Sequence, residues 1–235
     1  MYHSIRPGQI WLDTEGKRIQ AHGGSIITVD GVYYWYGENK EKTTGEDKIW
    51  HWGVRCYSSR DLYNWKDEGI IIPPDLENKN SSLHPFSMMD RPHIVYNEKT
   101  GKYAAWLKIM GEPPYFAVLS ADHILGPYKM VNPRVNPFGM EVGDFDIAVS
   151  AEEKRAYLYS ERPHTMLYCA ELNEDYTDVG ETVFRAFSTY SASRNEGGSG
   201  TFYEKRPALS DHLRYNGLPS QSIGGCRFRL MAWAV

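Results

Sequence analysis

The sequence predicts an all-β fold built from repeated antiparallel sheets, and two patterns lead to this prediction. Apolar residues show almost no helical spacing; instead, short runs rich in tyrosine, valine, isoleucine and tryptophan alternate with turns of glycine, proline, asparagine and aspartate. A unit of short strands also recurs about every 50 to 70 residues, which is typical of the blades of a β-propeller. We therefore expect about three blades and part of a fourth.

Short segments with the composition of strands follow one another along most of the chain. Turn residues separate several of them into hairpins, most plainly at Asp30-Gly31 and at residues 99–102. The expected strands are residues 24–29, 32–36, 53–58, 92–96, 103–109, 116–120, 147–150, 156–160, 166–171 and 201–204.

The repeats share one internal order. A first strand leads through a hairpin to an aromatic second strand, at residues 33–36, 103–106 and 157–159, and a third strand carries small residues, as at 56–59 and 118–121. Aromatic side chains on such strands usually pack between neighbouring sheets. Most of the tyrosines and tryptophans are therefore expected in the core.

Length and composition exclude several classes of protein. The chain has 235 residues, 41% of them hydrophobic, enough for one packed core or for part of a larger repeat domain. Its formal net charge of -4 leaves no basic surface for nucleic acid. No apolar run approaches the roughly 18 residues of a membrane span. We expect neither a nucleic acid nor a membrane as partner.

The cysteines and the first residues bear on the cellular compartment. Cys56, Cys169 and Cys226 are an odd number at wide spacing, which argues against a disulfide framework and a zinc site. The first eight residues lack the apolar segment of a secretory signal. The expectation is a cytoplasmic protein, or an exported one written without its signal peptide.

Three acidic segments indicate a carbohydrate site. Residues 89–93 (Met-Asp-Arg-Pro-His), 143–147 (Gly-Asp-Phe-Asp-Ile) and 159–164 (Tyr-Ser-Glu-Arg-Pro-His) each set a carboxylate beside an Arg-Pro or an aromatic residue at a predicted strand start. Carboxylates carry out the acid and base steps in cleavage of a glycosidic bond. Aromatic faces stack on the apolar faces of sugar rings. An oligosaccharide or polysaccharide is therefore the expected substrate.

Several longer motifs, in order, resemble glycoside hydrolase family 43, in the branch of exo-β-1,3-galactanases and related β-galactosidases. They are residues 20–24 (Gln-Ala-His-Gly-Gly), 33–38 (Tyr-Tyr-Trp-Tyr-Gly-Glu), 57–65, 90–97 (Asp-Arg-Pro-His-Ile-Val-Tyr-Asn) and 143–146 (Gly-Asp-Phe-Asp). The resemblance spans roughly residues 5 to 180. It implies a five-bladed β-propeller with an inverting active site on its axis, where acidic residues of different blades converge.

The resemblance also implies roles for individual residues. Asp144 matches the family's orienting aspartate, which tunes the pKa of the general acid, and Asp146 is the alternative if the alignment starts from the following strand. Asp90 matches an acidic substrate-binding residue that is usually glutamate. Glu38 resembles a further ligand of sugar hydroxyl groups. His22 stands near the family's usual general-base aspartate, so the base assignment stays open.

The general acid has a single candidate. The family places it in an Arg-Glu-Ala-Pro segment at the start of the fourth blade, and the chain has Arg194-Asn195-Glu196 followed by glycines there. Glu196 is the only acid near the expected position. An inverting mechanism holds its acid and base roughly 6.5 to 9.5 Å apart, and flexible glycines would fix that geometry poorly.

Other residues have a structural and a functional interpretation. Trp35 or Trp52 could stack on the sugar, and His22 could be a substrate ligand or a buried imidazole. The histidines lack metal-ligand spacing, and the glycines at 197–200 lack the lysine of a phosphate-binding loop. We therefore expect no metal ion and no cofactor.

The last 30 residues differ from the rest, so we divide the chain into an incomplete propeller domain at 1–205 and an irregular segment at 206–235. Back-translation of 206–228, read one base out of register, can give a string with strand alternation that resembles the family. We expect a frameshift near Lys205, a hypothesis that the coding DNA decides. Two functions follow: an exo-acting, inverting glycoside hydrolase that releases terminal galactose or arabinose from plant-type side chains, or a catalytically impaired propeller remnant that binds sugar weakly or not at all.

Overall fold

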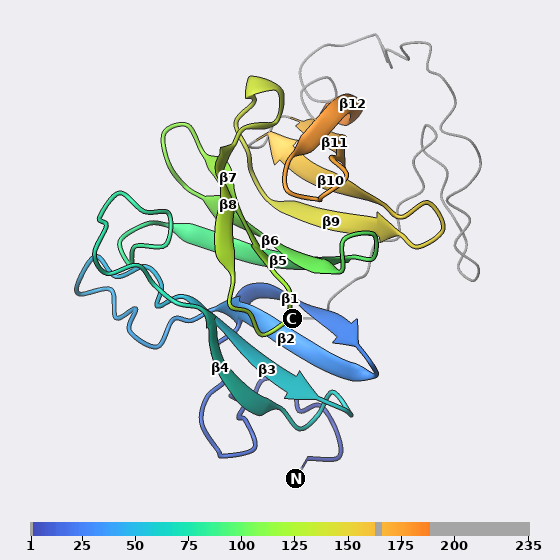
Figure 1. Cartoon of the computed structure of the whole chain (residues 1–235). Helices are drawn as coiled ribbons and strands as arrows, with labels where there is room; N and C mark the ends of the chain where they lie inside the picture. Colours follow the sequence, from blue (N-terminus) through green and yellow to red (C-terminus); the bar gives the residue numbers. More distant parts are fainter. Residues whose placement is uncertain (1, 163–165, 189–235) are drawn as a thin grey trace, which may run out of the picture.

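The computed structural model describes residues 2–162 and 166–188, and they form three four-stranded antiparallel sheets. Figure 1 shows the sheets side by side in the order of the sequence, as the blades of a propeller lie. The predicted all-β propeller fold is thus confirmed for these residues. The predicted strand at 201–204 and the segment 206–235 lie outside the described residues.

Each blade is a meander in which consecutive strands pair. The first blade contains β1 (His22–Val29), β2 (Val32–Glu38), β3 (Val54–Ser59) and β4 (Lys66–Ile72). The second contains β5 (Met89–Asn97), β6 (Lys102–Ile109), β7 (Tyr115–Ala121) and β8 (Lys129–Val135). A 3₁₀ turn, η1 (Pro137–Gly139), leads to the third, with β9 (Phe145–Ser150), β10 (Arg155–Arg162), β11 (Met166–Leu172) and β12 (Val179–Ser188).

The last strand of each blade, β4, β8 or β12, was not predicted. Two of these strands give little apolar signal, because β4 begins Lys66-Asp67-Glu68-Gly69 and β8 is largely exposed and contains Pro133. Proline has no backbone N–H to donate to a neighbouring strand, so it is tolerated at a sheet edge, where no such hydrogen bond is required. Outer strands that face solvent lack the alternation that identifies half-buried strands.

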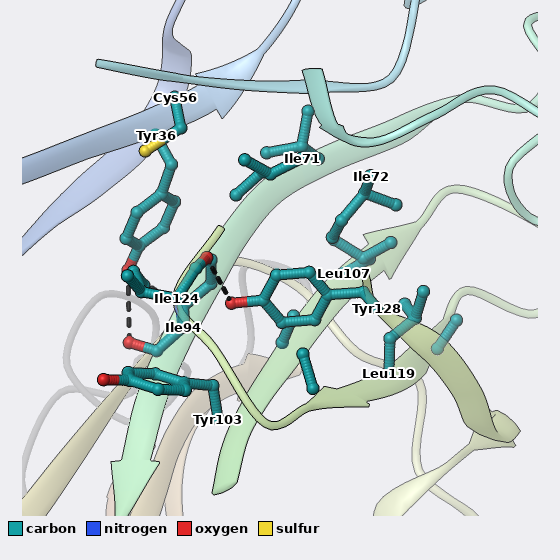
Figure 2. Close-up of a cluster of buried hydrophobic side chains, with 14 of the residues drawn as sticks. Tyr36, Cys56, Ile71, Ile72, Ile94, Tyr103, Leu107, Leu119, Ile124 and Tyr128 are labelled. Atoms are coloured by element: carbon teal, nitrogen blue, oxygen red, sulfur yellow. Dashed lines mark hydrogen bonds between the residues drawn. The ribbon is translucent and has the colours of Figure 1, made fainter. Parts of the chain in front are cut away.

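The core lies between the blades. One cluster joins the first and second blades (Figure 2) and includes Tyr36, Ile72, Ile94, Leu107 and Leu119. A second cluster joins the second and third blades around a fully buried tryptophan of β6, Trp106. Facing sheets therefore bury their inner residues against each other, and β1, β5 and β9, the first strands, lie next to one another.

Polar side chains join the blades at defined points. The buried Tyr36 hydroxyl of β2 donates a hydrogen bond to the Ile94 carbonyl of β5 (3.3 Å) and accepts one from the Ile94 amide (2.8 Å) (Figure 2). Burial raises the pKa of Tyr36. Between the next two blades, Trp106 Nε1 donates to the Tyr176 carbonyl at 2.8 Å. These bonds satisfy backbone groups at the open edges of strands and loops.

Among residues 2–162 and 166–188, no helix is long and apolar enough to cross a membrane.

We expect Tyr36→Phe to lower the free energy of unfolding by about 1 to 3 kcal/mol, because both backbone groups of Ile94 lose a buried partner. Tyr34→Phe, two residues earlier on β2, is the matched control, since Tyr34 is only partly buried. Urea unfolding of the three proteins measures the difference. Equal losses in the two variants would contradict the role of the Tyr36 hydroxyl.

Candidate functional site

Charged side chains of all three blades meet at one end of the inner strands. The starts of β1 and β5 pair with the ends of β2 and β6, His22 opposite Glu38 and Asp90 opposite Lys108. In the third blade, the Glu161 amide donates to the Asp144 carbonyl at 3.0 Å. We call the group assembled here the charged cluster: His22, Glu38, Lys40, Asp90, Arg91, Lys108, Asp144 and Glu161.

Irregular backbone conformations at the strand starts set the orientation of several of these residues. The register of β1 shifts between His22 and Ser25, and that of β5 shifts between Asp90 and His93, as in a β-bulge. Gly23 has φ +58° in the first shift, where a Cβ atom would lie 2.9 Å from a carboxylate oxygen of the cluster. Arg91 has φ 48° in the second, a conformation unfavourable for a residue with a side chain. Such strain is frequent at functional sites.

Asp144 is held between two cations. Lys108 Nζ lies 2.8 Å from its Oδ1 and Arg91 Nη2 lies 2.7 Å from its Oδ2. Burial alone would raise the pKa of Asp144, but the hydrogen bond and charge of Lys108, with the charge of Arg91, lower it below the ordinary value. The side chain is 47% exposed. Asp144 is therefore an ionised carboxylate open to solvent, which suits an orienting residue rather than a proton donor.

Asp90 lies on the other side of the same lysine. Its Oδ1 accepts a hydrogen bond from Trp50 Nε1 at 3.0 Å, and its Oδ2 lies 3.9 Å from Lys108 Nζ. Lys108 is nearly buried, so its ammonium group depends on these carboxylates for compensation. One lysine thus connects the two candidate carboxylates of the second and third blades.

Glu38 is a buried member of the cluster, with a side chain 1% exposed. Its Oε1 accepts the Arg91 amide at 3.1 Å and lies 3.4 Å from His22 Nδ1. Lys40 Nζ lies 2.6 Å from Oε2, an ion pair without the alignment of a hydrogen bond. The expected contact of Glu38 with sugar hydroxyl groups does not match this burial. In this structure Glu38 fixes the bulge that carries Arg91.

The other expected residues take different places. Asp146, the alternative to Asp144, is 75% exposed and lies 3.3 Å from His93 Nε2. Burial lowers the pKa of His93, and the charge of Asp146 partly offsets this effect. His22 is exposed rather than buried. Glu196 lies outside the described residues.

Trp35 is not near the cluster. Its ring packs between Trp11 and Trp65, with centroids 5.0 and 5.3 Å away, under the N-terminal segment on the outer part of the first blade. Trp35 is therefore partly buried against a core cluster of the first blade, and its expected contact with sugar stays a prediction. Trp52 packs against Lys42 Nζ, 3.5 Å from the ring centroid. The tryptophan that reaches the cluster is Trp50, which sequence analysis missed.

Lys108 was missed by sequence analysis, and an alignment of the repeats could have found it. At or one residue before its end, each second strand has an aromatic residue, any residue and a charge: Tyr36-Gly37-Glu38, Trp106-Leu107-Lys108 and Tyr159-Ser160-Glu161. Aligning the repeats would have placed the three charges at equivalent positions. It would also have placed Glu161 at the end of β10, where the structure has it, rather than at a strand start.

A separate cleft of about 340 Å³ runs between β1, β5 and β9, lined mainly by the middle and far parts of these strands. His93 lines it, but the cluster carboxylates Asp90 and Asp144 do not. Within residues 2–162 and 166–188, no group of three or more histidine, cysteine or carboxylate side chains could hold a metal ion. The charged cluster is therefore our candidate site on grounds of chemistry rather than of cavity size.

The loop that carries Trp50 is anchored by a buried histidine. His51 Nδ1 accepts the Gly53 amide at 2.9 Å, and Nε2 lies 3.1 Å from the His84 carbonyl, to which it donates in the neutral tautomer. The Trp50 amide donates to the Pro85 carbonyl at 2.7 Å. Burial lowers the pKa of His51 to about 4. Neutral His51 thus ties the Trp50 loop to the segment before β5.

No family model matches the chain, and no curated protein matches it by sequence. Solved structures do. A β-1,3-galactosidase of glycoside hydrolase family 43 is 29% identical with a TM-score of 0.68, over 78% of this chain and 39% of that one. An exo-β-1,3-galactanase from Phanerochaete chrysosporium, solved with β-1,3-galactotriose, is 27% identical with a TM-score of 0.65, over 76% of this chain and 41% of that one.

A second family 43 β-1,3-galactosidase, solved with galactodeoxynojirimycin, is 28% identical with a TM-score of 0.67, over 78% of this chain and 67% of that one. The chain thus spans about two fifths of the length of the first two structures. In its described fold, the chain is similar to β-1,3-galactosidases and galactanases of glycoside hydrolase family 43.

We expect Lys108→Met to raise the pKa of Asp144, because the variant removes the hydrogen bond and positive charge that favour the carboxylate form. Side-chain carboxyl NMR titration of both proteins measures this shift. Lys102→Met, whose lysine pairs with the exposed Asp122 on the opposite end of β6, is the control. If the pKa of Asp144 is the same in Lys108→Met as in the wild type, Lys108 does not lower it and this account is wrong.

We expect His51 to make stability depend on pH. Its pKa of about 4 in the folded protein lies below the ordinary 6.5, so its stabilising effect is complete above pH 6.5 and is lost as the pH falls toward 4. Because of this group, the free energy of unfolding should fall by about 2 kcal/mol as the pH is lowered from 7 to 5. Urea unfolding should show a smaller pH dependence for His51→Asn but not for the exposed His123→Asn. The same change of the free energy of unfolding with pH in all three proteins would contradict this account.

Proposed function

We propose that the chain belongs to an exo-acting, inverting glycoside hydrolase that releases terminal galactose, or arabinose, from plant-type polysaccharide side chains. The observation that carries the proposal is the pair of carboxylates on different blades, Asp90 and Asp144, joined by Lys108 at one end of the inner strands. The similarity of the fold to family 43 β-1,3-galactosidases supports galactose as the sugar.

The cluster has the chemistry of a sugar-binding surface. Asp144 and Arg91 are about half exposed, at 47% and 49%, so the pair offers both acceptors and donors to sugar hydroxyl groups. Asp90 is 19% exposed and its carboxylate is already oriented by Trp50. Hydrogen bonds between a sugar hydroxyl and an ionised side chain are stronger than hydrogen bonds between two neutral groups.

Cleavage requires a proton donor and a base in addition. An inverting enzyme places the two roughly 6.5 to 9.5 Å apart, with the water between them. In our proposal Asp144, as a fixed negative charge, keeps the pKa of a neighbouring acid high and orients it. Glu196 is the proposed acid, and the base remains open. Asp146, which is paired with His93, is the alternative to Asp144 as the orienting residue.

A second function, sugar binding without hydrolysis, has one observation in its favour. Within the described part of the chain, Asp144 is held ionised by two cations and Glu38 is buried. Neither carboxylate is therefore placed to donate a proton to a glycosidic oxygen, so hydrolysis depends on Glu196, and without a proton donor there the site would bind sugar only. A chain that keeps these contacts could bind a sugar without cleaving it.

We expect Asp144→Asn to lower hydrolysis of an aryl β-galactoside and of β-1,3-galactobiose by about 100-fold or more, because the amide cannot supply the negative charge that tunes the acid. Asp122→Asn, an exposed aspartate away from the cluster, should leave the rate unchanged. Near-normal turnover of Asp144→Asn would transfer the orienting role to Asp146 or end the assignment.

Calorimetry with galactose on the same proteins separates the two functions. Turnover by the wild-type chain supports the hydrolase. Binding of galactose without turnover supports the sugar-binding alternative. Absence of both would contradict a sugar site at the cluster.

A further inference from the structure

We propose that three exposed apolar side chains beside the charged cluster, Phe86, Met88 and Met110, bind the second sugar unit of the substrate. We call them the apolar rim. This inference rests on the proposed function, in which the cluster holds the terminal unit. The rim would then contact the unit that follows it along the oligosaccharide.

The position of the rim follows from the β5–β6 ladder. Asp90 pairs with Lys108 and Met89 with Ile109, and the Met110 amide donates to the Met88 carbonyl at 2.9 Å, which extends the ladder by one pair. Met88 and Met110 lie just outside β5 and β6, each at the centre of a tight turn in which the Met89 amide donates to the Ser87 carbonyl and the Gly111 amide to the Ile109 carbonyl. The Met88–Met110 pair therefore lies one pair beyond Met89–Ile109, at the same end of the sheet as Asp90 and Lys108.

The exposure pattern supports this placement. Phe86, Met88 and Met110 are 52%, 43% and 39% exposed. In contrast, Met89, next to Met88, and Ile109, next to Met110, are 0% and 3% exposed. Single exposed apolar residues are ordinary. Here Phe86 and Met88 precede Asp90 by four and two residues, and Met110 pairs with Met88, so exposed apolar side chains border a polar site. Exposed apolar side chains in such a place often mark a binding site.

The rim is also held in place. The Phe86 amide donates to His84 Nδ1 at 3.1 Å, and the two rings meet edge to face with centroids 4.8 Å apart. The Trp50 amide bonds the Pro85 carbonyl while Trp50 Nε1 bonds Asp90. The segment that carries Phe86 is thus fixed to the same tryptophan that orients the cluster carboxylate. Trp50 thus links the rim segment to the cluster through two hydrogen bonds.

A sugar unit fits the chemistry of this surface. A pyranose ring has an apolar face of C–H groups, which packs on aromatic and thioether side chains, while its hydroxyl groups stay near water or the cluster. Three side chains are too small a surface for a stable protein partner, which buries about 800 Å² on each side. A second copy of the chain is therefore the less favoured occupant.

The test compares a monosaccharide with a trisaccharide. Calorimetry with galactose and with a non-hydrolysable β-1,3-galactotriose, in which sulfur replaces the glycosidic oxygens, is carried out on the full chain, on Phe86→Ala/Met88→Ala/Met110→Ala, and on Met130→Ala/Val131→Ala, a control pair exposed on β8. We expect the rim variant to bind galactose as the wild type does and to bind galactotriose about tenfold more weakly, the scale of one buried apolar contact. The control should match the wild type with both sugars.

Each other outcome has one meaning. Galactotriose binding that is unchanged in the rim variant, or weakened in the same ratio as galactose, overturns the rim and leaves the proposed function intact. A wild-type chain that binds neither sugar overturns both. Sedimentation that shows a wild-type dimer abolished in the rim variant assigns the surface to a second copy. Phe86→Ala alone, with thermal unfolding as a check, gives the same comparison if the triple variant does not fold.

Discussion

The buried ammonium group of Lys108 is the interaction on which the candidate site depends. A lysine on the second strand of a blade is almost removed from water, so it must be compensated by opposite charge. Asp90 provides that charge from its own blade and Asp144 from the next. Because the compensation comes from two blades, the start of β9 is held against the end of β6. The same contact keeps Asp144 ionised and partly exposed.

A second layer of contacts holds the backbone that presents these charges. Arg91 has an unfavourable left-handed conformation between Asp90 and Pro92, which persists only where the surroundings fix it. Glu38 accepts a hydrogen bond from the Arg91 amide, and the Arg91 guanidinium pairs with Asp144. The buried acid of the first blade thus orients the exposed pair formed by the second and third. Removal of Glu38 from the solvent is consistent with this structural role.

The fold was predictable where burial dictates the sequence pattern. The inner three strands of each blade pack against other blades, so their aromatic and β-branched residues identified them correctly. The outer strands β4 and β8 face solvent on one side, and their charged residues and Pro133 gave no such pattern. Apolar and polar residues alternate where one face of a strand is buried, and the edge strands are buried less than the inner ones.

The site was predictable only in part, for a related reason. Asp90 and Asp144 became candidates through the acidic segments and the family resemblance, and the structure places both beside Lys108. Lys108 was missed because a lone lysine at the end of a strand usually indicates a solvated group. A sequence does not show which neighbours a strand tryptophan contacts, and in the structure Trp35 packs against Trp11 and Trp65, whereas Trp50 reaches the cluster.

The central claim, that the charged cluster is the sugar site, is tested most directly by backbone amide NMR during titration with galactose. The account predicts that signals of Arg91, Lys108 and Asp144 shift together at one apparent affinity. Signals of Thr28, Tyr96 and Lys154, at the far end of the cleft between the inner strands, should stay in place. Shifts confined to the far end of that cleft, or no shifts at saturating galactose, would contradict it.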